Sequence, residues 1–378
     1  MRSFLIFAGI PTVLCIAAVA QDAAAGIDEL MAAANAKYLH RDYAASLALY
    51  EQARQAVEQT PAEDPRRYDV LKRLTTVASA AGDYAAANRY LDAAIQWRLD
   101  RVGPNDPQVI ANRLQQVGIY RAMGDDASAR DVLETVIVKH EELGGRRSPA
   151  LADDHSLMGQ LDFESHKKAE AAQEWELALA LRGLNAGPLD VTQVPDLDRL
   201  GGVYIELLRY RDAEETYRKA LIIRESVLGS EHADLLATLD GLAYSYFGQK
   251  KYEETEPVYK RLIALWTKSV GETHPMLAIA MDKLAVFYVA QEKYDQAREA
   301  REQANAIRAL FLAQGLRKEA ADVASAGDLP GAIALSRRAL RTLDPPNPLY
   351  DELREALSRN EGPEGWAAKA EKKSATKK

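Results

Sequence analysis

The sequence has a single cysteine among its 378 residues, Cys15, which lies in an apolar run at the N-terminus. Disulfide bonds, cysteine nucleophiles and cysteine-based metal sites all require thiols. If the N-terminal run is removed during export, the mature chain has no thiol for any of them.

The motifs of common enzymes are also missing. The six histidines form no HExxH motif and no pair at the spacing of metal ligands on a helix, and no G-x-S-x-G motif, phosphate-binding glycine loop or Rossmann fingerprint occurs. We therefore expect no catalytic residue, no metal site and no cofactor, and a protein that is not an enzyme. A hydrolase or transferase would have to use the region where candidate ligands are densest, which contains Asp153, Asp154, His155, Asp162 and His166. His155 and Asp162 lie two helical turns apart, ~10 Å, which is too far for a shared metal ion.

Charge of one sign is not concentrated in the chain. The 48 Lys and Arg residues against 56 Asp and Glu residues give a formal net charge of −8, and no basic stripe is present that could neutralise phosphates. A nucleic-acid partner is therefore not expected. The 47% of hydrophobic residues and 28% of charged residues are typical of a folded chain, which excludes disorder of the whole protein.

The N-terminal twenty residues have the pattern of a secretory signal peptide. Arg2 precedes an apolar run that Gly9 and Pro11 interrupt, and the run ends in Ala18-Val19-Ala20, which predicts cleavage before Gln21. From Phe4 to Ala20 the run has 17 residues, which is short for a membrane span. We predict an exported protein, periplasmic or extracellular, without stable membrane insertion after cleavage. Anchoring by an uncleaved N-terminal segment is the alternative.

The rest of the chain follows a 42-residue repeat. Three repeats begin at Gly187, Gly229 and Gly271. The same 42-residue spacing continues towards the N-terminus through Gly145 and Gly103 to a comparable loop at Pro61. Tyrosine and leucine recur in fixed columns: Tyr204, Tyr246 and Tyr288; Tyr210, Tyr252 and Tyr294; Leu200, Leu242 and Leu284. We expect inter-helix packing of the column tyrosines Tyr204, Tyr246, Tyr252, Tyr288 and Tyr294. A fixed period indicates stacked units, each too small to bury its own apolar face.

Each unit predicts a pair of helices. A loop with Asp, Ser or His, followed in four units by Pro, precedes a helix of about fourteen residues, a turn and a longer second helix. The loop side chains can accept hydrogen bonds at a helix start; they are Asp64, Asp106, Ser148, His232 and His274. Small residues recur where the two helices would cross: Ala87, Ala129, Ala171, Ala213 and Ala297 in one column, and Gly159, Gly201, Ala243 and Ala285 in another.

Phrases such as LDGLAYSYFGQKKYEETEPVY and YRDAEETYRKALIIRESVLG resemble tetratricopeptide repeats of the 42-residue kind found in kinesin light chains. The resemblance covers about Ile27 to Pro345. It implies an all-α, right-handed superhelical solenoid of antiparallel helix pairs, about eight in number. It also implies that the first helices line a concave face that holds peptides or partner proteins.

The predicted layout is a signal peptide at 1–20, an atypical N-terminal pair at 21–60, six regular units at 61–312, a compact repeat at 313–345, a capping helix at 346–360 and a disordered Lys-rich tail at 361–378. The unit that starts at Gly145 is irregular, because His155, Asp162 and Lys168 replace an apolar residue and two tyrosines of the other units. We expect its core to be weakened, with a kink or a locally opened stack.

The candidate binding residues are three aspartates and one tyrosine. Asp198, Asp240 and Asp282, the acid ladder, recur at the 42-residue spacing in the predicted first helices, and Tyr244 belongs to no aromatic column. On a concave face the carboxylates would attract a basic or polar segment; a solvated acidic row beside Arg199 and Lys283 is the alternative. We predict a non-catalytic exported scaffold for a protein or peptide partner. The second hypothesis is a ligand- or peptide-sensing regulator whose superhelix changes shape on binding.

Overall fold

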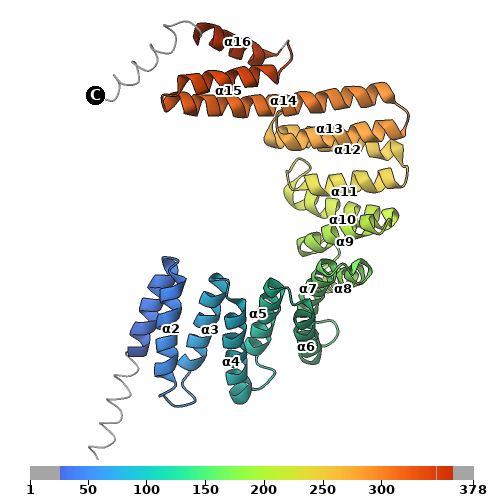
Figure 1. Ribbon diagram of the computed structural model, residues 1–378. Helices are drawn as coiled ribbons and strands as arrows, with labels where there is room; N and C mark the ends of the chain where they lie inside the picture. The colour runs from blue at the N-terminus through green and yellow to red at the C-terminus, as the bar shows by residue number, and fades with distance from the viewer. Residues whose placement is uncertain (1–25, 346, 361–378) are drawn as a thin grey trace, which may run out of the picture. The chain divides into compact units, whose positions relative to one another are not determined.

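The computed structural model describes residues 26–345 and 347–360, and the predicted all-α class of helix pairs is confirmed there (Figure 1). The described residues form helices joined by short turns, with no strand among them. The chain divides into two compact units, Met1–Pro188 and Leu189–Lys378. The predicted signal peptide and the Lys-rich tail lie outside the described residues.

The first unit holds a helix over residues 26–39 and three complete pairs after α2. Ser46 donates a hydrogen bond from its hydroxyl to the carbonyl of Ala34 (2.8 Å), which ties the first two helices together. The later pairs are α3/α4, α5/α6 and α7/α8. The helix bounds are α2 Tyr43–Val57, α3 Arg66–Ala80, α4 Tyr84–Val102, α5 Pro107–Met123, α6 Asp126–Gly144, α7 Pro149–Glu164 and α8 Lys168–Ala186.

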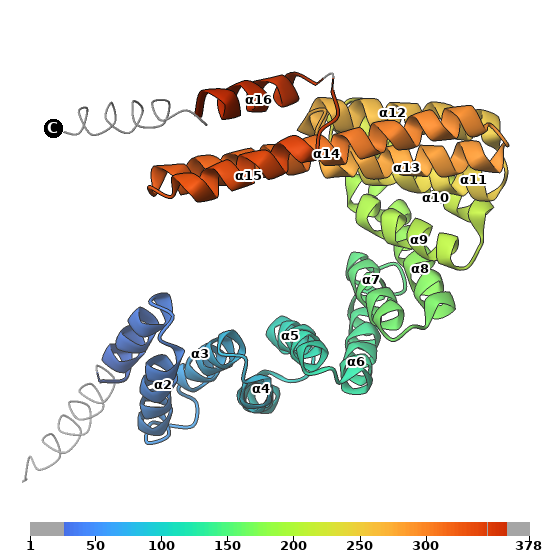
Figure 2. The same ribbon diagram turned by 45° about the horizontal axis from the view of Figure 1, so that its top comes forward.

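The second unit begins with a short 3-10 helix, η1, and continues with pairs α9/α10, α11/α12 and α13/α14. α14 is much longer than its counterparts: it runs without a break past residue 312, the predicted end of the regular units, and then lies beside α15 (Figure 2). The helix bounds are η1 Val191–Gln193, α9 Val194–Glu206, α10 Tyr210–Leu228, α11 Leu235–Gly248, α12 Tyr252–Val270, α13 Pro275–Ala290, α14 Tyr294–Ser325, α15 Leu329–Arg341 and α16 Pro348–Asn360.

The glycines that mark the period have a common backbone role. Each one caps the C-terminus of a second helix with φ between 71° and 95° and ψ between 164° and 177°. Side chains are excluded from this part of φ/ψ space, which is almost restricted to glycine. The repeat is therefore fixed by a backbone requirement at Gly103, Gly145, Gly187, Gly229 and Gly271.

The predicted helix-start residues are confirmed with one exception. Asp106 accepts a hydrogen bond from the backbone N–H of Gln108 (2.7 Å), and His274 accepts one from Met276 (3.2 Å). Asp64 and His232 make equivalent bonds at the starts of α3 and α11. The prediction is wrong for Ser148, whose side chain makes no such bond; Ser148 still precedes Pro149 at the first position of α7, and its backbone carbonyl accepts from Leu151 (3.1 Å).

The small residues at the helix crossings make room for large side chains of the second helices. A Cβ on Gly159 would lie 2.9 Å from Nε1 of Trp175, and a Cβ on Gly201 would lie 2.7 Å from the ring of Tyr217. Tyr217 also presses against Gly241 of α11, so its ring is held between the first helices of two successive pairs. Because a methyl group at Gly159, Gly201 or Gly241 would lie too close to these rings, these three positions require glycine, whereas Ala243 and Ala285 fit at the later crossings.

The tyrosine columns differ in burial. Tyr204, Tyr246 and Tyr288 are buried, as predicted. Packing was also expected of Tyr294, and this prediction is wrong because the side chain is 66% exposed. Tyr294 opens α14, whose first turn has no following regular unit to cover it.

The polar substitutions in the irregular unit all have partners. Buried Asp162 is paired with the guanidinium of Arg130, and His155 Nδ1 lies 2.7 Å from a carboxylate oxygen of Glu174. Trp175 supplies the missing apolar bulk: it is buried, and its indole donates to the carbonyl of Ser156 (3.1 Å). The polar groups are thus compensated, and the weakening of this core stays a prediction.

The crossing at Gly241 provides a test. Gly241→Ala should destabilise the protein by about 1–2 kcal/mol, because overpacking against the Tyr217 ring exceeds the gain in helix propensity. Gly315→Ala is the matched control, since α14 offers open space at that position, and it should be neutral or stabilising by up to ~1 kcal/mol. Thermal unfolding followed by circular dichroism measures both, and an equal or higher melting temperature for Gly241→Ala would contradict the packing described.

Candidate partner-binding site

The acid ladder lies on the first helices of the second unit. Asp198, Asp240 and Asp282 occupy α9, α11 and α13 at equivalent positions, with side chains 27%, 37% and 37% exposed. Asp198 and Asp240 both lie near the buried ring of Tyr217, at the edge of the packed core. Burial, assisted by these two carboxylates, raises the pKa of the Tyr217 hydroxyl above its usual range.

Each ladder carboxylate is paired with a cation. Arg224 of α10 binds both oxygens of Asp198, at 2.8 and 2.5 Å, and Arg308 of α14 binds Asp282. Asp240 instead contacts Nζ of Lys283, with both oxygens at 2.7 Å. The ladder is therefore a row of ion pairs, and its negative potential is largely compensated.

From the sequence, only Arg199 and Lys283 were predicted as cations beside the acid ladder, and the two arginine partners were not identified. Arg224 and Arg308 each follow their aspartate by 26 residues, and the 42-residue period places them at equivalent positions, but the period does not show that they contact the aspartates. Arg199 lies beside the ladder but contacts Asp196, one turn earlier on α9 (3.3 Å). The role of the four candidate residues in binding stays a prediction.

Asp240, the middle of the three aspartates and here called the middle rung of the ladder, has a different environment from Asp198. At the position that corresponds to Arg224, the next pair has Trp266, and Ala280 replaces Thr238, whose hydroxyl contacts both Arg224 and Asp198. Asp240 therefore lacks the arginine and the hydroxyl of its counterpart. Lys283 reaches it from α13, the first helix of the following pair.

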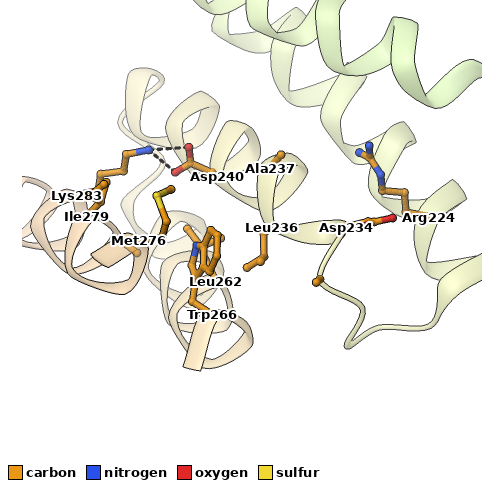
Figure 3. Close-up of a pocket in the computed structure, with 12 residues that line it drawn as sticks. Arg224, Asp234, Leu236, Ala237, Asp240, Leu262, Trp266, Met276, Ile279 and Lys283 are labelled. Atoms are coloured by element: carbon orange, nitrogen blue, oxygen red, sulfur yellow. Dashed lines mark hydrogen bonds and ion pairs between the residues drawn. The ribbon is translucent and has the colours of Figure 1, made fainter. Parts of the chain in front are cut away.

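A pocket of about 500 Å³ opens at this rung, between α11, α12 and α13. Figure 3 shows Trp266 between Met276 and Leu236, with the Asp240–Lys283 pair above Met276. The walls are mainly apolar: Leu236, Ala237, Leu262, Trp266, Met276 and Ile279. Asp234, Asp240, Lys283 and Arg224 supply the charged groups. An apolar cavity with a few charged groups is the usual form of a binding site.

The structure brings one predicted residue, Asp240, into this pocket. Asp198, Asp282 and Tyr244 do not line it. Tyr244 lies on the surface of α11, 43% exposed, with its ring 6.4 Å from that of Tyr210. Met276, Ile279 and Val286 on α13 are also exposed, by 39%, 42% and 50%. The face of α13 at the pocket thus carries partly exposed apolar side chains.

Other kinds of site find no support in the described residues. No group of three or more His, Cys, Asp or Glu side chains in residues 26–345 and 347–360 is placed to hold a metal ion. Among the described helices, none is both long and apolar enough to cross a membrane. Around His155 the candidate ligands are divided among separate partners: His140 with Asp154, Glu174 with His155, Arg182 with Asp153 and Arg130 with Asp162.

Comparison with known proteins identifies the repeat. Residues 193–254 and 234–309 match the tetratricopeptide repeat family model, and no curated protein matches the chain. Part of a TPR repeat-containing protein from Cytophaga hutchinsonii superposes with a TM-score of 0.55 at 14% identity, covering 74% of this chain and 95% of that one. BtubC from P. vanneervenii is 18% identical (TM-score 0.39; 75% and 91% covered), and a putative kinesin light chain from Podosopora anserina is 19% identical (0.35; 65% and 97%). The predicted resemblance to tetratricopeptide repeats is confirmed over residues 193–309.

The two kinds of rung should differ in stability. Arg224→Met removes hydrogen bonds to a carboxylate that is only 27% exposed, and we expect a loss of about 1–3 kcal/mol. Lys283→Met breaks a pair that is more than one-third exposed on both sides, and it should cost under ~1 kcal/mol. Urea unfolding of the two variants measures the difference. Equal losses, or a larger loss for Lys283→Met, would show that the middle rung is not the loosely held one.

Proposed function

We propose that this chain, whose residues 193–309 are tetratricopeptide repeats, is a non-catalytic scaffold that binds a protein or peptide partner. The binding surface is the face formed by α9, α11 and α13. The observation that carries the proposal is the pocket between α11 and α13, which has apolar walls and one weakly held ion pair.

The exposed apolar residues around the pocket support this assignment. Met276, Ile279 and Val286 follow one another along α13, and all three are at least 39% exposed. Covering apolar surface contributes roughly 25 cal/mol per Å², so a partner segment laid along α13 would gain from each of these side chains. The helices beneath are already fixed by the core, so little conformational entropy is lost on binding.

Export is the second part of the proposal. It rests on the sequence of residues 1–20, with a charged start, an apolar run and Ala18-Val19-Ala20 before Gln21. These residues lie outside the described part of the chain. The scaffold would then act in the periplasm or outside the cell, where its partner is to be sought.

Two exposed isoleucines provide a matched test of the binding face. A photo-crosslinking residue at Ile279 on α13 should capture a defined partner in the native compartment, whereas the same residue at Ile222 on α10, 54% exposed, should not. Ile279→Glu should weaken affinity for that partner about tenfold or more, because a charge replaces an apolar contact, and Ile222→Glu should leave it unchanged. Equal capture from both positions would argue against this face.

The export proposal has its own measurement. Intact-mass analysis of the protein purified from its native cells should give a chain that begins at Gln21. A chain that retains the first twenty residues and sediments with membranes would favour the anchored alternative.

A further inference from the structure

The neighbouring repeats show which chemical group binds the aspartate that is equivalent to Asp240 of the pocket. In two of three successive pairs, an arginine from the second helix binds the ladder aspartate: Arg224 on Asp198 and Arg308 on Asp282. In the pair between them the arginine is replaced by Trp266, and the carboxylate of Asp240 remains. Asp240 therefore retains the carboxylate acceptor, but the second helix of its pair supplies no guanidinium group like those of Arg224 and Arg308.

The space left by the arginine is open and of suitable chemistry. The trio Asp198, Arg224 and Thr238 becomes Asp240, Trp266 and Ala280 in the next pair, so two polar groups give way to an indole and a methyl group. Asp240 and the two replacements, Trp266 and Ala280, all line the pocket of about 500 Å³. A carboxylate beside an aromatic face suits a cation with an aliphatic stem.

We propose that an arginine side chain of the bound partner occupies this pocket. Its guanidinium pairs with Asp240, as Arg224 and Arg308 pair with their aspartates, and its stem packs on Trp266 and Met276. This inference rests on the proposed function and names the partner's chemistry: an extended segment that presents an arginine to the gap between α11 and α13.

Lys283 is the internal competitor for the same carboxylate. Its ammonium group contacts both oxygens of Asp240, but the two side chains are 38% and 37% exposed, and such pairs are weak. A guanidinium binds a carboxylate through two parallel hydrogen bonds and can stack on an indole, which an ammonium group does less well. The flexible stem of Lys283 allows it to move into solvent when the arginine enters.

The other charges around the pocket are compatible with a cation. Arg224 is held by Asp198, and Asp234 adds a second carboxylate at the rim, with a side chain 65% exposed. Once Lys283 is displaced, the charged groups that line the pocket are the carboxylates of Asp234 and Asp240 and the guanidinium of Arg224, which Asp198 already neutralises; His232 lies 3.7 Å from Asp234 outside the lining. The pocket then favours a positively charged guest.

The test uses a probe of defined chemistry on the full chain. The four tryptophans are labelled with 5-fluorotryptophan, and the ¹⁹F resonance of Trp266 is assigned by its loss in Trp266→Phe. Titration with acetyl-arginine amide should shift this resonance saturably, with a Kd on the order of 1 mM for so small a ligand. Acetyl-norleucine amide has an apolar stem and no charge, and it should bind about tenfold more weakly or not at all.

Three variants decide whether the carboxylate and its competitor act as proposed. Asp240→Asn should weaken the arginine probe about tenfold, and the matched control Asp282→Asn, whose aspartate is paired with Arg308, should not. Lys283→Met should tighten binding several-fold, because the competitor is gone. All variants are first checked for wild-type circular dichroism.

Several results would overturn the inference: norleucine binding as well as arginine, Asp240→Asn binding normally, or Lys283→Met binding more weakly. The failure of the inference is distinguishable from that of the proposed function. If Ile279 still captures a partner while the arginine probe does not bind, the scaffold stands and its partner uses other chemistry. If the probe binds as described and no partner is captured, the pocket assignment stands and the scaffold proposal fails.

Discussion

The close approach of first and second helices within each pair is the constraint on which the rest of the structure depends. Tyr217 shows it most directly, because its ring lies between Gly201 of its own pair and Gly241 of the next. One side chain thereby sets both the crossing within a pair and the spacing between two pairs. Other positions of the first helices are left partly exposed, and there the helices carry the ladder aspartates and the exposed Met276, Ile279 and Val286.

Charged groups between the helices follow the same register as the packing. The ladder aspartates accept from second-helix arginines, and the irregular unit uses Arg130 to compensate Asp162 where other units have tyrosine. Such pairs contribute modestly to stability, and removing one partner alone is costly. Among the three ladder aspartates, only Asp240 has no second-helix arginine, and this position coincides with the pocket. The loss of an arginine from an otherwise regular set of ion pairs is the feature that marks the candidate site.

The fold could be predicted from the repeat. The candidate site could be predicted only in part, because it depends on ion pairs between side chains of different helices. Gly187, Gly229 and Gly271 revealed the period because their backbone conformation excludes other residues, and buried Tyr204, Tyr246 and Tyr288 followed from the same 42-residue spacing. Tyr294 did not follow it, since burial depends on a neighbour that the end of the regular array lacks. Nor could columns of single residues show that Arg224 and Arg308 neutralise the ladder. Those contacts join different columns, and finding them needs the distance between helices as well as the period.

The continuity of α14 has a consequence for the end of the array. In most stacked repeats, neighbouring units are coupled only through their interfaces, so the terminal unit can fray while the rest stays folded. Here the second helix of the last regular pair runs on without a break and packs against α15. Unfolding of α15 and α16 would expose part of α14, and another part of the same helix packs against α13. The C-terminal helices should therefore unfold together with α13 and α14 as one cooperative block.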